Sequence, residues 1–106
     1  SEIEMTQKIN VGEYGKAIPF DVSEDVSSNT NQLYFKKPDG TILKKDAVVG
    51  LTNLQTAKGL FLANQYVTYT PISSDIDVSG RWMARVVSDS GTSLVKTDWQ
   101  KLEVRA

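Results

Sequence analysis

Hydrophobic and polar residues alternate most regularly over residues 81–87. Successive side chains of an extended strand point to opposite sides, so the apolar ones here share one face. The polar stretch 88–92 follows with turn-forming residues, and its Gly91 can adopt the positive φ of a short hairpin loop. Residues 93–96 begin a return strand. The pattern predicts a β-hairpin whose inner face is formed by Trp82, Ala84 and Val86.

Further strands are predicted wherever a short alternating stretch ends at a turn signal. The sharpest turn is Pro38-Asp39-Gly40, because proline presets φ at the first turn position and glycine accepts the left-handed one. Pro19 cannot donate to a strand ladder, which predicts an open edge or a bulge around it. The predicted strands comprise residues 18–22, 32–37, 41–49, 65–70, 81–87, 93–96 and 99–104.

Two segments are less regular. Residues 50–64 include Thr52-Asn53-Leu54-Gln55, which has the form of a helix capping box, but Gly59 and the lack of a 3.6-residue apolar period favour a loop and then a strand from near Leu60. Residues 1–12 alternate loosely and are expected to form an edge strand or an N-terminal arm. About seven short strands separated by turns predict a small all-β sandwich or barrel, in one domain of residues 1–106.

Composition narrows the function classes. The 106 residues include 12 Lys and Arg against 13 Asp and Glu, a net charge of −1, which provides no overall field for nucleic acid or an anionic membrane. The lack of cysteine and histidine removes disulfides, the usual zinc sites, thiol nucleophiles and the commonest general base. No segment approaches the length of a membrane span, and the chain is expected to be made and kept in solution. We therefore expect neither a nucleic-acid nor a membrane partner.

Two groups of acidic residues are candidate sites. Asp75 and Asp77 could bind calcium, but one Asp-x-Asp pair falls short of six oxygen ligands, and turn capping is the favoured interpretation. The trio of Asp21, Glu24 and Asp25 could serve acid–base chemistry, but no nucleophile or phosphate-binding loop accompanies it. We predict no metal, no cofactor and no catalysis.

Basic and apolar residues give the candidate interface. Four lysines flank the Pro38-Asp39-Gly40 turn and could dock on an acidic protein surface or phosphates, although lysines also protect edge strands from stray pairing. Apolar residues near the N-terminus precede the first firm strand and could be buried by a neighbouring subunit. Aromatic residues could form a stacking platform for a glycan or base, although core packing is the more common role. The interface candidates are Ile3, Met5, Lys36, Lys37, Lys44 and Lys45, and the aromatic set is Tyr14, Tyr34, Tyr66 and Trp99.

Four segments together resemble small immunoglobulin-like virion proteins of tailed bacteriophages, and are similar to the N-terminal domain of phage baseplate upper proteins. The likeness lies in the order and spacing of a strand leading to a Lys-Pro-Asp-Gly-Thr turn, a Tyr-Val-x-Tyr strand and an Asp-Ile-Asp-x-x-Gly-x-Trp segment, and it covers the chain from about residue 12 to its end. The segments are residues 15–22, 34–41, 66–69 and 75–82.

The resemblance implies an immunoglobulin-like antiparallel β-sandwich and a non-enzymatic structural role in the phage particle. Such a protein would be a head decoration (auxiliary capsid) protein or a tail, neck or baseplate part, made in the host bacterial cytoplasm and located in the virion. Its partners would be other virion proteins, contacted in many symmetric copies. The alternative is a β-sandwich module that binds a carbohydrate or a protein ligand, for which exposed aromatic residues at one loop end would be the distinguishing feature.

Overall fold

The computed structural model describes residues 7–106, which form eleven strands. None of the described residues forms a helix that is long and apolar enough to cross a membrane. The strands are β1 (Gln7–Asn10), β2 (Ile18–Asp21), β3 (Thr30–Lys36), β4 (Ile42–Asp46), β5 (Val48–Val49), β6 (Leu54–Thr56), β7 (Gly59–Phe61), β8 (Tyr66–Tyr69), β9 (Gly80–Asp89), β10 (Leu94–Lys96) and β11 (Gln100–Arg105).

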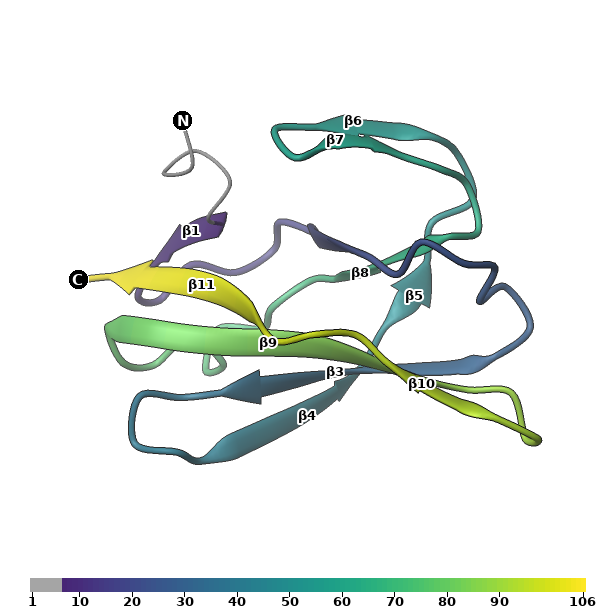
Figure 1. Ribbon diagram of the computed structural model, residues 1–106. Helices are drawn as coiled ribbons and strands as arrows, with labels where there is room; N and C mark the ends of the chain where they lie inside the picture. Colours follow the sequence, from purple (N-terminus) through teal and green to yellow (C-terminus); the bar gives the residue numbers. More distant parts are fainter. Residues whose placement is uncertain (1–6) are drawn as a thin grey trace.

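The strands form two facing sheets and a separate hairpin (Figure 1). The large sheet has the order β1-β11-β9-β3-β4, and β10 also pairs with β9. The small sheet has the order β2-β8-β5. Strand β1 runs parallel to β11, and the other pairs are antiparallel. In Figure 1, the β6–β7 hairpin stands away from both sheets.

The core lies between the two sheets. On the large sheet the inward side chains follow strand alternation, with Trp82, Ala84 and Val86 fully buried as predicted for β9. The rings of Phe35 and Trp82 meet edge to face with centroids 6.5 Å apart, and Phe20 of the small sheet packs on Phe35 at 6.2 Å. The predicted all-β sandwich is therefore confirmed. Because neither sheet closes on itself or joins the other, the barrel alternative does not apply to the described residues.

Both predicted hairpin turns are present. Gly40 has φ of 90° and Asp39 accepts a hydrogen bond of 2.9 Å from the backbone N–H of Thr41, so the chain reverses between β3 and β4. Gly91, with φ of 91°, reverses the chain between β9 and β10. Pro19 of β2 pairs with Thr68 of β8. Strand β2 is an edge of the small sheet, where a residue without an N–H can be accommodated.

The middle of the chain differs from the sequence prediction. Residues 41–49 were expected to form one return strand, but β4 ends at Asp46 and β5 pairs with β8, so the chain changes sheets at Ala47. The change of sheet allows Val49 to pack against the core from the small sheet. A strand does include Leu60, as predicted, but residues 54–56 also form a strand instead of a loop. These short pieces raise the strand number above the expected seven. The immunoglobulin-like topology stays a prediction with which the two sheet orders agree.

Candidate interaction surfaces

The four predicted interface lysines do not form one patch. In β3 and β4 they occupy adjacent pairs, and adjacent residues of a strand point to opposite faces. Lys37 and Lys45 share the side of Leu33 and Phe35, which faces the small sheet. Lys36 and Lys44 lie on the outer face of the large sheet. The two pairs therefore have different environments, and the role of the four lysines as interface residues stays a prediction.

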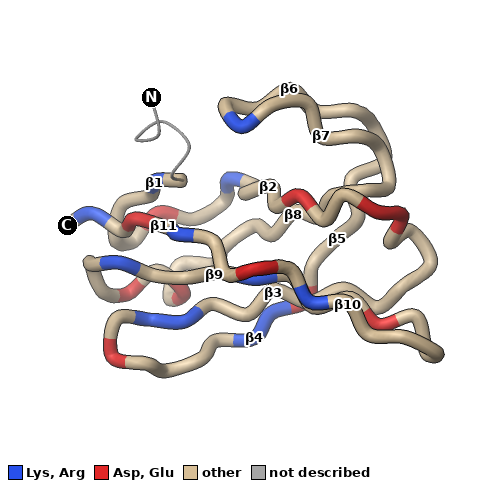
Figure 2. The backbone as a smooth tube through the Cα atoms, in the orientation of Figure 1, with Lys and Arg blue, Asp and Glu red and all other residues tan. Residues whose placement is uncertain are grey.

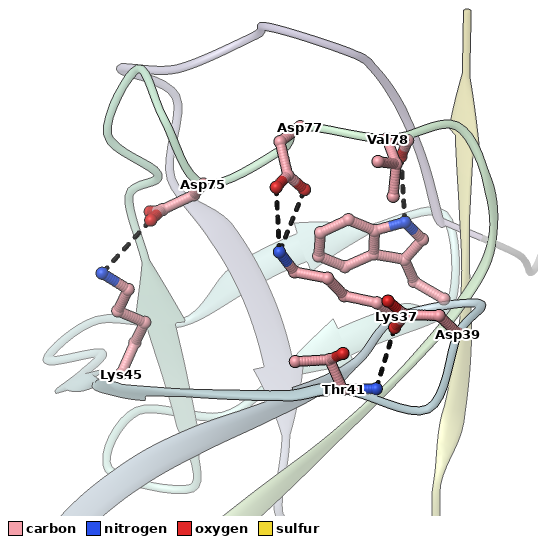
Figure 3. A network of polar contacts seen from close by, with 8 residues as sticks. Lys37, Asp39, Thr41, Lys45, Asp75, Asp77 and Val78 are labelled. Carbon is pink, nitrogen blue, oxygen red and sulfur yellow. Dashed lines mark hydrogen bonds and ion pairs between the residues drawn. The ribbon is translucent and has the colours of Figure 1, made fainter.

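Lys37 is fixed within the protein (Figure 3). Its ammonium nitrogen lies 3.0 Å from both carboxylate oxygens of Asp77 and 5.6 Å from the centre of the Trp82 ring system. The Trp82 indole N–H in turn donates to the carbonyl of Val78 at 3.1 Å. Lys37 thus links the end of β3 to the segment that leads into β9, and its charge is paired with that of Asp77.

Lys45 is held in the same way by Asp75. The ammonium nitrogen lies 3.2 Å from a carboxylate oxygen of Asp75, a residue that is only 4% exposed (Figure 3). The Tyr69 hydroxyl and the backbone N–H of Ile72 donate to the other oxygen. Burial alone would raise the pKa of the Asp75 carboxyl, but these hydrogen bonds and the Lys45 charge outweigh it and lower the pKa. Burial, with the hydrogen bond to Asp75, raises the pKa of Tyr69.

Asp75 and Asp77 therefore act as internal partners of two lysines and of a turn. No group of three or more Asp, Glu, His or Cys residues that could hold a metal ion occurs among residues 7–106. The other acidic candidates make local contacts: Asp21 accepts a hydrogen bond from Ser23 at 2.6 Å, and Asp25 accepts two from Ser27. These hydrogen bonds lower the pKa of the Asp25 carboxyl.

The outer face of the large sheet gathers most of the positive charge. Its outward strand positions carry eight of the 12 lysines and arginines but only three acids, Asp46, Asp89 and Glu103. Figure 2 shows the basic residues in blue along β1, β4, β9, β10 and β11. We call this surface the cationic face. Its basic residues are Lys8, Lys36, Lys44, Arg81, Arg85, Lys96, Lys101 and Arg105.

Several of these cations are held in position. The guanidinium carbon of Arg85 lies 4.6 Å from the centre of the Trp99 ring system, and its Nε–H donates to the carbonyl of Thr97 at 3.1 Å. Lys44 lies 5.0 Å from the centre of the Tyr34 ring. Since Arg85 also pairs with Tyr34 across β3 and β9, cations and rings form a row across the sheet.

Glu103 lies within the cationic face, between Lys8 of β1 and Arg81 of β9, and its pKa responds to the surrounding positive charge. Glu103 accepts a hydrogen bond of 2.7 Å from Arg105. That hydrogen bond, assisted by the charges of Arg105, Lys8 and Arg81, lowers the pKa of the Glu103 carboxyl. A carboxylate is therefore favoured at this surface.

The remaining sequence candidates lie apart. Ile3 and Met5 lie outside the described residues, so their role stays a prediction, whereas Gln7–Asn10 form an edge strand of the large sheet. The aromatic candidates are not brought together in one platform: Tyr66 is buried, Tyr14 lies in an exposed loop, and each of Tyr34 and Trp99 has a cation against its ring.

One surface was missed by sequence reasoning. Five of the exposed large apolar side chains belong to the segment of residues 48–62, on or beside the β6–β7 hairpin. The signal was present in the sequence, because residues 47–74 contain one charged residue, Lys58. A surface hairpin with so few charges exposes its apolar side chains to water.

A small hollow lies beside β1, β2 and β11. Its volume is about 150 Å³, and its lining includes Ile9, Ile18 and Leu102. Pockets for small organic ligands typically measure ~300–1,000 Å³, so this hollow is small for such a ligand.

Comparison with protein-family models gives no match, and neither does comparison with curated protein sequences.

Proposed function

We propose that this chain is a non-enzymatic structural component of a bacteriophage particle that acts through protein–protein contacts. The sequence resemblance implies a head decoration protein or a tail, neck or baseplate part, with other virion proteins as partners and many symmetric copies. The observation that carries the proposal is the cationic face, a broad sheet surface whose charge is far from that of the whole chain.

The make-up of the cationic face favours a protein partner. Arginine, methionine and aromatic side chains are enriched in protein interfaces, and Arg85, Met83 and Trp99 lie here. Exposed apolar side chains, Ile42 and Leu94, lie among the cations. The complementary surface is one rich in aspartate and glutamate. Each exposed ion pair contributes only ~0–1 kcal/mol, so the charges govern orientation and association rate, and multiple copies raise occupancy through avidity.

The carbohydrate-binding alternative has less support. Sugars and bases stack on open aromatic rings, whereas Tyr34 and Trp99 each have one ring face occupied by a cation of the same chain. Tyr14 is exposed but lies in the connection between β1 and β2, away from those two rings in the sequence and in the sheet order.

The test measures incorporation into particles. A phage lacking the gene for this chain is supplied with tagged protein in trans, and copies per particle are counted by quantitative mass spectrometry. We expect the variant with Lys36→Gln, Lys44→Gln and Lys101→Gln to load several-fold less than wild type at physiological salt. Raising the salt to about 0.5 M should reduce wild-type loading, because exposed charges are then screened beyond a few ångströms.

Lys16→Gln is the matched control, since Lys16 is exposed but lies outside the cationic face. A variant lacking residues 1–6 tests Ile3 and Met5 separately. If no particle contains the chain, the structural role is wrong. If particles contain the triple variant at the wild-type copy number, the role can stand but the cationic face is not its contact.

A further inference from the structure

Met83 occupies the centre of the cationic face. It lies on the outer side of β9, the middle strand of the order β1-β11-β9-β3-β4, and its side chain is half-buried. Its cross-strand partners are Lys101 on β11 and Lys36 on β3, and the next outward positions of its own strand are Arg81 and Arg85. The four positions of the face that lie nearest to this apolar side chain are therefore all basic. We call Met83 and these four cations the Met83 cluster.

The cations of the Met83 cluster form no ion pair with an acid of residues 7–106. The ion pairs within that part of the chain involve other cations, namely Lys37, Lys45 and Arg105. Glu103 lies opposite Arg81 across β9 and β11, but its ion pair is with Arg105. Like charges that share a small surface repel one another, and a negatively charged partner would relieve that repulsion.

Arg85 is held in a position suited to binding a carboxylate. Its guanidinium lies over the Trp99 ring system at 4.6 Å, and its Nε–H donates to the carbonyl of Thr97 at 3.1 Å. Its two terminal NH₂ groups make no hydrogen bond within residues 7–106, and together they can donate to both oxygens of one carboxylate. Because the guanidinium is already fixed, little side-chain freedom would be lost on binding.

The Met83 cluster suits a protein partner better than a nucleic acid. An apolar centre surrounded by polar groups that exclude water is the arrangement of binding hot spots in protein interfaces. Single-stranded nucleic acids stack their bases on open aromatic rings, whereas Trp99 and Tyr34 each have a cation against one ring face. The net charge of −1 also provides no long-range attraction for a nucleic acid.

We propose that the Met83 cluster is the anchor of the cationic face and binds a protein segment in which an apolar side chain is flanked by aspartate or glutamate. The apolar side chain packs on Met83, and the flanking carboxylates pair with the surrounding cations, one of them with both terminal NH₂ groups of Arg85. Positive charge alone would accept any acidic surface, so the apolar centre and Arg85 provide the selectivity. The choice of a protein as partner rests on the structural role proposed above.

The experiment follows the methyl group of Met83 by NMR during titration of the purified chain. The chain has two methionines, so isotope labelling of the methionine methyl groups gives two signals, which the variant Met5→Leu assigns. The first probe is the peptide Ser-Glu-Glu-Leu-Glu-Glu-Ser, and in the second probe serine replaces the leucine. We expect the first peptide to shift the Met83 signal saturably and to bind at least about threefold more tightly than the second, because the leucine is buried on Met83.

Two double variants with the same change in net charge separate the Met83 cluster from the rest of the cationic face. Lys36→Gln with Lys101→Gln removes two cations beside Met83 and should weaken binding of the leucine peptide at least about fivefold. Lys8→Gln with Lys96→Gln is the matched control, since it removes two exposed cations of the same face that lie farther from Met83. The control should weaken binding less than about twofold.

Arg85→Lys tests the guanidinium separately. The variant keeps the positive charge but cannot donate to both carboxylate oxygens in the same plane or stack on Trp99 in the same way. We expect it to weaken binding of the leucine peptide about fivefold. Binding equal to that of wild type would show that only the charge of Arg85 matters and would contradict its role in the anchor.

Several outcomes would overturn the anchor. They are a Met83 signal that neither peptide shifts, equal weakening by the two double variants, and tighter binding of an oligothymidylate or a short DNA duplex than of the leucine peptide at equal concentrations of phosphate and carboxylate. Loading into particles remains the separate test of the structural role. If particles contain the chain but Met83 does not respond, the anchor alone is wrong; if Met83 responds as expected but no particle contains the chain, the structural role alone is wrong.

Discussion

The cationic face and the β6–β7 hairpin are both exposed, but the fold supports them differently. The cationic face is the outer side of strands whose inner side forms the core, so Arg85 and its neighbours stand on strands that are paired and buried on their other face. The hairpin pairs with neither sheet and is supported by side-chain packing at Phe61, Tyr66 and Gly50. Charged side chains are well solvated at a surface, whereas exposure of apolar side chains to water is unfavourable in free energy. Burial of the hairpin's apolar side chains against a partner would remove that free-energy cost.

The difference predicts that contacts made by the two surfaces would respond differently to salt. Cations on a protein surface mainly govern the orientation and rate of association, and their effect weakens with salt. Contacts made by exposed apolar side chains of the hairpin would not be weakened by salt. Variants that disturb the support of one surface and leave the other unchanged therefore test the comparison directly.

The largest effect is expected from Trp82→Ala, because Trp82 is fully buried under both the cationic face and the Lys37–Asp77 pair. Removing a buried tryptophan should lower the free energy of unfolding by about 3–5 kcal/mol, a large share of the stability of such a domain. Urea denaturation followed by circular dichroism measures it. A midpoint close to that of wild type would contradict the placement of Trp82 in the core.

A smaller effect is expected from Asp75→Asn, which leaves the ammonium of Lys45 without its charged partner. Hydrogen bonds to charged groups contribute about 1.5–3 kcal/mol, so a loss of about 2 kcal/mol is expected at neutral pH. The measurement is urea denaturation at several pH values. Lys44→Gln, on the outer face of the same strand, is the control and should change stability by less than about 0.5 kcal/mol.

The pH dependence follows from the sign of the shift. The pKa of Asp75 is lowered in the folded protein, so its contribution is present above the unfolded carboxyl pKa of about 3.9 and is lost as pH falls through the lower folded value. The stability difference between wild type and Asp75→Asn should therefore shrink below about pH 4. A difference that stays constant from neutral to strongly acidic pH would show that the carboxylate charge has no part in it.

Strand alternation made much of the large sheet predictable. Trp82, Ala84 and Val86 were assigned to the inner face from period-2 spacing alone, and Pro38-Asp39-Gly40 identified the turn. The same rule separates the lysine pairs, since Leu33 and Phe35 point inward and Lys37 continues their side. Proximity to the turn groups the four lysines in the sequence, whereas strand alternation divides them between the two faces.

The small sheet and the hairpin were less predictable because their strands are short and pair with distant segments. Strand β5 has two residues, and its place is decided by pairing with β8, which no local pattern encodes. In residues 52–55 the capping-box pattern competed with strand pairing, and pairing across Ala57-Lys58 prevailed. Tertiary contacts override weak local preferences in such segments.

The last prediction concerns Gly50→Ala and separates the hairpin from the rest of the sandwich. The backbone cannot easily move here, because the N–H of Gly50 donates to the carbonyl of Tyr66 at 3.0 Å and its carbonyl accepts from Asn64 at 2.8 Å. The added methyl group must therefore displace the Tyr66 ring, which supports Phe61. Overpacking of this kind costs typically ~1–3 kcal/mol, and we expect the low end because an exposed hairpin can yield.

Hydrogen exchange measured by mass spectrometry distinguishes a local from a global effect. In Gly50→Ala, exchange should rise several-fold in peptides covering residues 54–61 and stay near wild type over residues 82–87, since hairpin opening does not require the core to open. Tyr66→Phe, which removes only the hydroxyl bond to Thr52, should give a smaller rise in the same peptides. Equal acceleration in both regions would mean that hairpin and core open as one unit, and that the two exposed surfaces share a single support.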